Sequence, residues 1–170
     1  MNQKYGMNQS TLAALAAFPD QLTAHYAAIP VNFRNWAPNS WDGIPSEPFT
    51  AIGHVCHIRD IEVDGYRIRF ERTLREVNPT LPSLDGMALA IERSYATSDA
   101  AEALAVFRRA RAETLNRLAS LSPEQFARKA TFTGYGSVSL KGLVHYLCSH
   151  DQQHLSGLQW LLGQIESLAG

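Results

Sequence analysis

The stretch SLKGLVHYLCSHDQQHLSGLQWLLGQIES, residues 139–167, decides the fold. Its apolar residues recur every three or four positions, the spacing that places side chains along one face of an α-helix. They are Leu140, Leu143, Val144, Leu147, Leu158, Leu161, Leu162 and Ile165. Ser139 precedes them and is a suitable N-cap. The stretch therefore predicts a long helix that buries one face in a helical core.

Three further segments show helical spacing, and loops rich in Pro, Gly and Asn separate them. The expected long helices cover residues 10–28, 49–77 and 98–121, and a shorter helix covers residues 83–95, with Ser10 and Ser83 as caps. Pro19 should kink the first helix or mark its first turn. A capping box at residues 122–125 opens a short turn, and residues 131–138 are expected to form a loop, with no β-hairpin. Four long helices predict an all-α four-helix bundle, a single domain over residues 1–170 with residues 1–9 as a loose leader.

Composition excludes several classes of function. The formal net charge is −1, and the arginines between residues 59 and 75 alternate with acids, which indicates a solvated helix face and no nucleic-acid footprint. No apolar run reaches the roughly 18 residues of a membrane span. Cys56 and Cys148 form no metal-binding or redox motif, and the polar start lacks a signal peptide, so we expect a cytoplasmic protein. The charged fraction of 18% and the apolar helices favour a homodimer.

Two histidines of the last helix stand on its apolar side. His154 falls near the middle of the apolar stripe and His150 on its edge, whereas His145 falls almost opposite and should be exposed. Side chains at positions i and i+4 project together from adjacent turns, as in helical metal sites. The alternative is a pair of buried histidines that hydrogen-bond within the core, but the stripe offers few polar partners. A metal site is therefore a candidate.

A third ligand should come from the helix over residues 49–77. His54 and His57 both lie on one of its apolar stripes, and geometry leaves the choice between them open. Asp60 follows His57 by three positions and is interpreted as a surface acid, with the alternative that it orients a ligand ring. The ExxH signature of di-iron bundles and the HExxH motif are absent, which favours one ion bound mainly by nitrogen.

The motifs resemble those of the DinB/YfiT-like family of metalloenzymes. The sequence has HxxDxE at His57, Asp60 and Glu62, and HDxxH at His150, Asp151 and His154. The resemblance selects His57 over His54 and implies a metal site of His57, His150 and His154 in a four-helix bundle. It also implies homodimers and one divalent ion, nickel or zinc in the first place, with iron or manganese as alternatives. Characterised members that depend on low-molecular-weight thiols imply thiol chemistry.

Three imidazoles leave a divalent ion an open position, which favours an enzyme. The first hypothesis is a thiol-dependent S-transferase acting on small electrophiles, in which the metal activates the thiol. The alternatives are a metal-dependent hydrolase and a non-catalytic metal-binding bundle. Arg59 or Arg67 would bind carboxylates of the thiol. Tyr66 and Tyr135 are interpreted as packing residues, with the alternative that they border the opening, and no catalytic residue is assigned.

Overall fold

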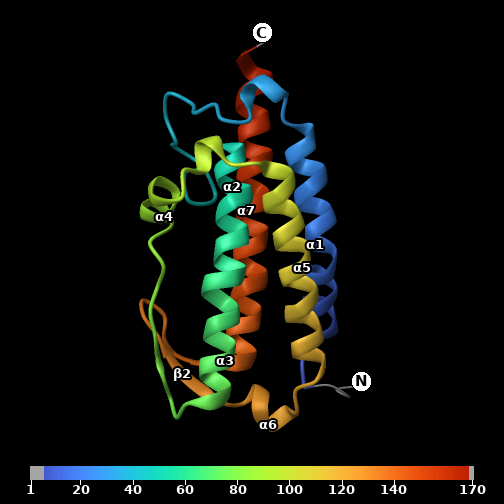
Figure 1. Cartoon of the computed structure of the whole chain (residues 1–170), viewed down its shortest axis with the longest axis vertical. Helices are drawn as coiled ribbons and strands as arrows, with labels where there is room; N and C mark the ends of the chain where they lie inside the picture. Colours follow the sequence, from blue (N-terminus) through green and yellow to red (C-terminus); the bar gives the residue numbers. More distant parts are fainter. Residues whose placement is uncertain (1–5, 169–170) are drawn as a thin grey trace.

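The computed structural model describes residues 6–168 and forms a bundle of long helices that run side by side (Figure 1). Its elements, in chain order, are α1 (Gln9–Ala28), η1 (Val31–Phe33), α2 (Ala51–Asp60), η2 (Ile61–Tyr66), α3 (Arg67–Arg75), β1 (Thr80–Leu81), α4 (Gly86–Glu92), η3 (Tyr95–Thr97), α5 (Ala100–Ala119), α6 (Pro123–Phe126), β2 (Lys129–Phe132), β3 (Gly136–Ser139) and α7 (Leu140–Leu168). The four rods of the bundle are α1, the continuous unit α2–η2–α3, α5 and α7. The predicted all-α four-helix bundle is confirmed.

Side-chain caps fix where most helices begin. Asn8 caps α1, one residue before the helix and two residues before the predicted Ser10. Asp85 caps α4 in place of the predicted Ser83. The capping box at Ser122 is present as predicted, and Ser139 accepts a hydrogen bond from the backbone N–H of Gly142 in the first turn of α7. These oxygens satisfy backbone N–H groups that have no partner within the helix. Pro19 lies inside α1, beyond its first turn, and the helix continues past it.

The predicted helix over residues 49–77 contains a wider turn in its middle. The segment η2 is a π-helical turn, in which the N–H of Arg67 donates to the carbonyl oxygen of Glu62, five residues earlier. A π-helical turn contains one residue more than the α-helical ladder allows, so it rotates the faces before and after it relative to each other. Periodicity alone did not reveal this rotation.

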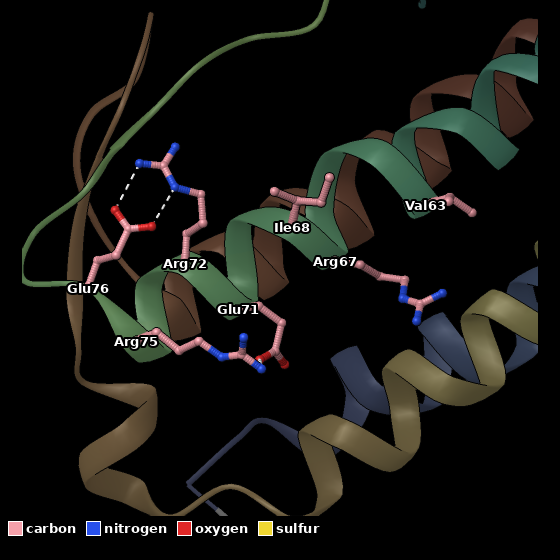
Figure 2. A pocket seen from close by; sticks show the side chains of 7 residues that line it. All are labelled: Val63, Arg67, Ile68, Glu71, Arg72, Arg75 and Glu76. Carbon is pink, nitrogen blue, oxygen red and sulfur yellow. Dashed lines mark hydrogen bonds and ion pairs between the residues drawn. The ribbon is translucent and has the colours of Figure 1, made fainter.

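The outer face of the same rod carries the paired charges expected from the sequence. Figure 2 shows a pocket there, lined by Arg67, Arg72, Arg75 and their acidic neighbours. Arg72 donates to Glu76 from both Nε and Nη2, at 2.8 and 2.9 Å. Because these charges are exposed or half-buried and neutralise one another, the prediction of a solvated helix face is confirmed for them.

A small three-stranded sheet lies beside α3 near one end of the bundle (Figure 1), and the prediction that no hairpin forms is wrong. Strands β2 and β3 pair antiparallel, with Thr131 opposite Ser137, and β1 pairs parallel to β2. Gly134 and Gly136 take φ values of 87° and 83°, which glycine adopts at little cost and which the tight turn requires. The turn glycines indicated a loop correctly, but the residues on either side of that loop pair as two short strands.

The core lies between the four rods in two clusters of buried apolar side chains. One contains Phe18, Leu22, Phe107 and Leu158, and the other contains Leu15, Phe126, Leu143 and Leu147. Trp36 and Trp41 of the loop before α2 are half-buried and pack against the first cluster. No helix of residues 6–168 has the length and apolar character needed to cross a membrane.

Candidate metal centre

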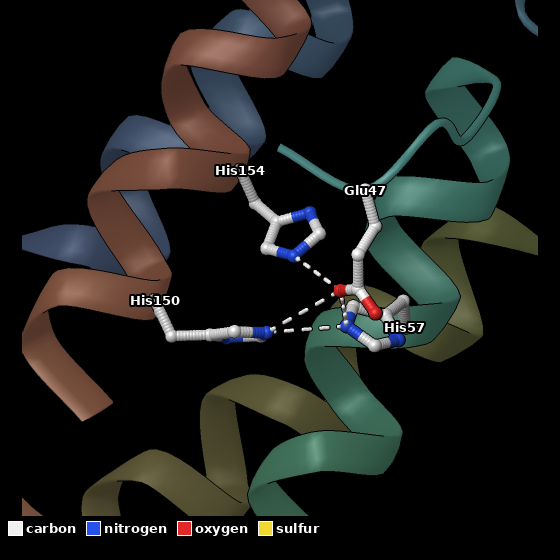
Figure 3. A group of neighbouring side chains, drawn as sticks. All are labelled: Glu47, His57, His150 and His154. Atoms are coloured by element: carbon white, nitrogen blue, oxygen red, sulfur yellow. Dashed lines mark hydrogen bonds and ion pairs between the residues drawn. The ribbon is translucent and has the colours of Figure 1, made fainter. Parts of the chain in front are cut away.

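Two rods and one loop bring four possible ligands together. α2 contributes His57, α7 contributes His150 and His154, and the loop before α2 contributes Glu47 (Figure 3). One ligand atom from each lies within 4.8 Å of all the others. His57 and His154 are 1% exposed, and the side chain of Glu47 is 44% exposed, so the group is open on the glutamate side.

In all three imidazoles, Nε2 is the nitrogen that faces the carboxylate of Glu47. Oxygen Oε2 of Glu47 lies 2.8 Å from Nε2 of His57, 3.2 Å from Nε2 of His154 and 3.8 Å from Nε2 of His150. Nε2 of His57 and Nε2 of His150 are 3.2 Å apart. Two nitrogens bound at about 2.0–2.1 Å to a tetrahedral ion lie about 3.3 Å apart. The spacing therefore fits a divalent ion held by these nitrogens.

His54 lies behind the cluster and does not share its centre. Its Nδ1 is 2.8 Å from Nδ1 of His154. If Nε2 of His154 binds an ion, Nδ1 of that ring carries the proton and donates a hydrogen bond to Nδ1 of His54. Burial, with the nearby His57, lowers the pKa of His54 to about 3, so its ring is neutral and accepts. The structure thus separates the two candidates, with His57 beside His150 and His154 in the cluster and His54 as a hydrogen-bond partner of His154.

The charges of the group suit a cation. Burial lowers the pKa of His150 and lowers that of His154 further, which keeps both rings in the neutral form that binds metals. Burial acts to raise the pKa of Glu47, but hydrogen bonds from His150, His154 and His57 outweigh it and hold that pKa far below its usual value. One ionised carboxylate beside neutral imidazoles forms a mixed nitrogen and oxygen donor set.

Glu47 was missed by the sequence analysis. It lies in the loop before α2, a segment in which no ligand was expected from the sequence. The available signal was a single acid between Pro45 and Pro48, shortly before a histidine-bearing helix. Prolines restrict the backbone on both sides of Glu47 and favour one loop path.

Asp60 is neither the surface acid nor the ring-orienting acid considered from the sequence. It is 3% exposed and accepts hydrogen bonds from the hydroxyl of Tyr95 and from Nε of Arg59. Arg93 lies 3.1 Å from the same carboxylate. Asp60 therefore joins α2 to the segment around η3.

The other two motif acids share one buried arginine. Asp151 and Glu62 are 1% exposed, and each accepts two hydrogen bonds from the guanidinium of Arg111. The carbonyl oxygen of Leu15 accepts a further one. Asp151 therefore orients no ligand ring but joins α7 to α5. Sequence reasoning missed Arg111, although it falls on the buried side of α5 between Phe107 and Thr114.

A pocket of about 300 Å³ opens beside the histidines. His57, His150 and Glu47 form one part of its wall, and Tyr66 and Tyr135 form another. Both tyrosines therefore border the opening, which was the alternative interpretation. Arg59 and Arg67 are absent from its lining, since Arg59 pairs with Asp60 and Arg67 with Glu113 of α5. The expectation that either binds a substrate carboxylate in this pocket is wrong.

The family model described as the DinB superfamily matches residues 11–157. The chain belongs to the DinB superfamily. A solved structure with the same fold, YfiT from Bacillus subtilis, is described as a probable metal-dependent hydrolase with an unusual four-helix bundle topology. It aligns with a TM-score of 0.82 at 18% identity, over 98% of this chain and 90% of that chain. No curated protein matches the sequence.

The local geometry brings together the three histidines that the resemblance implied as ligands. Three histidines and one glutamate, drawn from α2, α7 and the preceding loop, form a cluster that suits a metal ion. The resemblance seen in the sequence is therefore confirmed for the family and the fold, and the three predicted ligands lie together in a group that could hold a metal ion.

Proposed function

We propose that this DinB-superfamily chain is a metal-dependent hydrolase. In this proposal His57, His150 and His154 bind one divalent ion, and Glu47 is the general base. The observation that carries it is the position of the Glu47 carboxylate, within 3.8 Å of all three Nε2 atoms and on the open side of the cluster. The description of YfiT as a probable metal-dependent hydrolase supports the same reaction class.

A divalent ion held by three imidazoles would supply Lewis acidity to water or to a carbonyl oxygen at its open position. The protein's own contribution is the placement of a base. Nitrogens that bind the ion no longer donate hydrogen bonds to Glu47, and its carboxylate would then accept the proton of the attacking water and return it to the leaving group. The half-exposed side chain on a loop allows that movement, whereas the buried rings of His57 and His154 stay fixed.

The donor set favours zinc or nickel, and iron or manganese are the alternatives. Imidazole nitrogen binds all four metals, but zinc and nickel stand above manganese and iron in the usual order of affinity. A single carboxylate is too few oxygen ligands for calcium or magnesium. We therefore expect zinc or nickel to bind most tightly.

A thiol-dependent S-transferase is the second candidate. The pocket of about 300 Å³ beside His57 and His150 is large enough for a small thiol and contains a buried cation, Arg69. A thiol whose sulfur approached the open position would lose its proton there more readily, and the thiolate is the nucleophilic form. In this reaction Glu47 would accept the thiol proton.

The first experiment compares wild-type protein with Glu47→Gln and His57→Ala, all expressed without a histidine tag. Metal content is measured by mass spectrometry, and each metal-loaded protein is tested with ester and amide substrates and with a thiol plus an electrophile. The hydrolase proposal predicts bound metal and hydrolysis in the wild type, bound metal but at least about a hundredfold less hydrolysis in Glu47→Gln, and little metal in His57→Ala.

The other outcomes decide between the alternatives. Thiol transfer without hydrolysis would replace the hydrolase by the transferase. Loss of metal in Glu47→Gln would make Glu47 a fourth ligand and close the site. A wild type that binds metal, is stabilised by it and shows neither activity would support the non-catalytic bundle.

A further inference from the structure

Arg69 is a buried cation without an acidic partner. It is 5% exposed, and its Nε has no hydrogen-bond partner among the described residues. Within residues 6–168, no carboxylate lies at ion-pairing distance from it, and its one hydrogen bond is a long contact of 3.4 Å from Nη2 to the carbonyl oxygen of Pro82. A buried charge is costly unless it is paired, so an unpaired arginine indicates a partner from outside the chain.

Comparison with Arg111, which is also buried, shows how unusual the unpaired charge of Arg69 is. Arg111 is 1% exposed, and two carboxylates take up its donors. Where a buried guanidinium links helices of the bundle, the fold therefore pairs it fully with carboxylates. Burial lowers the pKa of Arg69, yet a guanidinium remains protonated at neutral pH.

Aromatic rings and a glycine hold the guanidinium in place without neutralising it. Its central carbon lies 4.8 Å from the ring centre of Tyr66 and 4.6 Å from that of Phe132. A Cβ on Gly65 would approach Nη1 of Arg69 to 3.2 Å, so the glycine leaves room for the guanidinium. Aromatic rings that pack against a planar guanidinium orient it and leave its edge available for hydrogen bonds.

The π-helical turn aligns Arg69 with the metal centre. In an unbroken α-helix, twelve positions correspond to about 1200°, which would leave Arg69 about 120° around the helix from His57. The extra residue of the turn reduces this to about eleven helical steps, or about 1100°, which leaves a difference of about 20°. Arg69 and His57 accordingly line the same pocket, and π-helical turns are frequent at functional sites.

We propose that Arg69 binds a carboxylate group of the substrate while the other end of that substrate reacts at the histidine cluster. The proposal rests on the metal-dependent function proposed above and names its substrate class, a small molecule with one carboxylate remote from the reacting group. A single guanidinium with a free planar edge matches the charge and shape of a carboxylate.

The helix sets the length of such a substrate. Nη1 of Arg69 lies beside Gly65, and Gly65 is about seven helical steps from His57 once the extra residue is discounted. At 1.5 Å per step the two ends of the pocket are about 10 Å apart along the helix. Tyr66 lies between them on the pocket wall and would pack against the connecting chain.

Two matched probes test the proposal. Both carry a hydroxamate, which binds divalent metals, at one end of an alkyl chain of about 10 Å, and they carry either a carboxylate or a neutral alcohol at the other end. Their dissociation constants are measured by calorimetry on metal-loaded protein. The wild type should prefer the carboxylate by about tenfold or more, the range of a charge-assisted hydrogen bond.

Variants of Arg69 test whether this residue causes the preference for the carboxylate probe. Arg69→Met should abolish it while leaving affinity for the alcohol probe unchanged, and Arg69→Lys should keep part of it because it keeps the charge. Arg67→Met is the control, since Arg67 is on the same rod but pairs with Glu113 outside this pocket. Replacement of an unpaired buried charge by an apolar side chain should not lower the melting temperature, whereas loss of a merely structural arginine would.

The same titrations on metal-free protein separate this proposal from the proposed function. A carboxylate preference that remains without metal and disappears in Arg69→Met would support the Arg69 subsite even if metal binding failed. Equal affinity for the two probes in the wild type, with and without metal, would overturn the subsite, as would a preference that survives in both Arg69→Met and Arg69→Lys.

Discussion

Nδ1 of His54 lies 2.8 Å from Nδ1 of His154, and this contact defines a supporting role for His54. Removal of such a partner costs about 10–100-fold in metal affinity because the ligand ring loses its orientation. We expect His54→Ala to weaken zinc binding by this factor, and His57→Ala to abolish stoichiometric binding. His54→Asn, which offers an oxygen near the position of Nδ1, should recover part of the loss. Competition with a chromophoric chelator measures the affinities.

His145→Ala is the control for these variants, because His145 is exposed on α7 and hydrogen-bonds to Thr11. Its zinc affinity should equal that of the wild type. Full affinity in His57→Ala together with complete loss in His54→Ala would reverse the assignment of ligand and partner.

Gly86, the first residue of α4, leaves space for the ring of His57. A Cβ at this position would lie 2.8 Å from Cε1 and 2.9 Å from Nδ1 of His57. Because contacts this short require movement of the ring, Gly86→Ala should weaken zinc binding by about tenfold without removing a ligand atom. The chelator competition described for His54 measures the change.

Gly163→Ala provides the matched control, since nothing lies within 4 Å of a Cβ built on Gly163, an exposed residue of α7. This substitution should raise the free energy of unfolding by about 0.5–1 kcal/mol and leave zinc affinity unchanged. Unchanged zinc affinity in Gly86→Ala as well would mean that α4 yields to the new methyl group and does not position His57.

Most of the fold was predictable because each long helix buries apolar residues that recur every three or four positions. The apolar stripe of residues 140–165 gave the last helix, and Ser122 and Ser139 carried the capping chemistry seen in the structure. The β2–β3 hairpin was missed because its strands have four residues each, too few for a clear alternation. The π-helical turn was missed because the spacing of apolar residues does not show whether backbone hydrogen bonds span four residues or five.

The candidate site was predictable where its residues share a helix. His150 and His154 stand one turn apart on α7, so their spacing indicated a pair of ligands. Glu47, Arg69 and Arg111 were missed because their roles depend on contacts between segments distant in the sequence. Burial of Asp60 and Asp151 was missed for the same reason, since Tyr95 and Arg111, which donate hydrogen bonds to them, come from other elements.

Arg111 joins three rods of the bundle through charges that are almost fully buried. Removal of one partner from such a group leaves uncompensated charge and costs about 3–5 kcal/mol. Arg111→Met should therefore lower the free energy of unfolding by about that amount, with the metal-free protein as the reference. Addition of Glu62→Gln and Asp151→Asn to Arg111→Met should restore part of the stability, because neutral amides no longer need the cation. Urea unfolding followed by circular dichroism measures both effects.

Arg108→Met is the control for Arg111, one turn earlier on α5. Arg108 pairs with Asp20, and the two side chains are 49% and 83% exposed, so solvent screens the pair. Its loss should cost less than about 1 kcal/mol. Equal destabilisation by the two substitutions would show that burial of the Arg111 group contributes nothing beyond an ordinary surface pair.

Asp60 gives the bundle a predictable response to acid. Burial acts to raise the pKa of Asp60, but hydrogen bonds from Arg59 and Tyr95 and the charges of Arg59 and Arg93 outweigh it, so the folded-state pKa is lowered. A lowered folded-state pKa contributes stability above the unfolded value of about 3.9, and that stability is lost as the pH falls through the folded-state pKa. Asp60→Asn should therefore be less stable than the wild type by about 1.5–3 kcal/mol at pH 5–8.

The difference between wild type and Asp60→Asn should shrink below about pH 4, because protonation removes the same charge from the wild type. Urea unfolding at a series of pH values measures it, and Asp42→Asn in the exposed loop before α2 is the control and should show no such trend. A difference that stays constant down to pH 2 would mean that Asp60 stabilises the fold by its shape and hydrogen bonds alone. In that case the link between α2 and η3 would not depend on its charge.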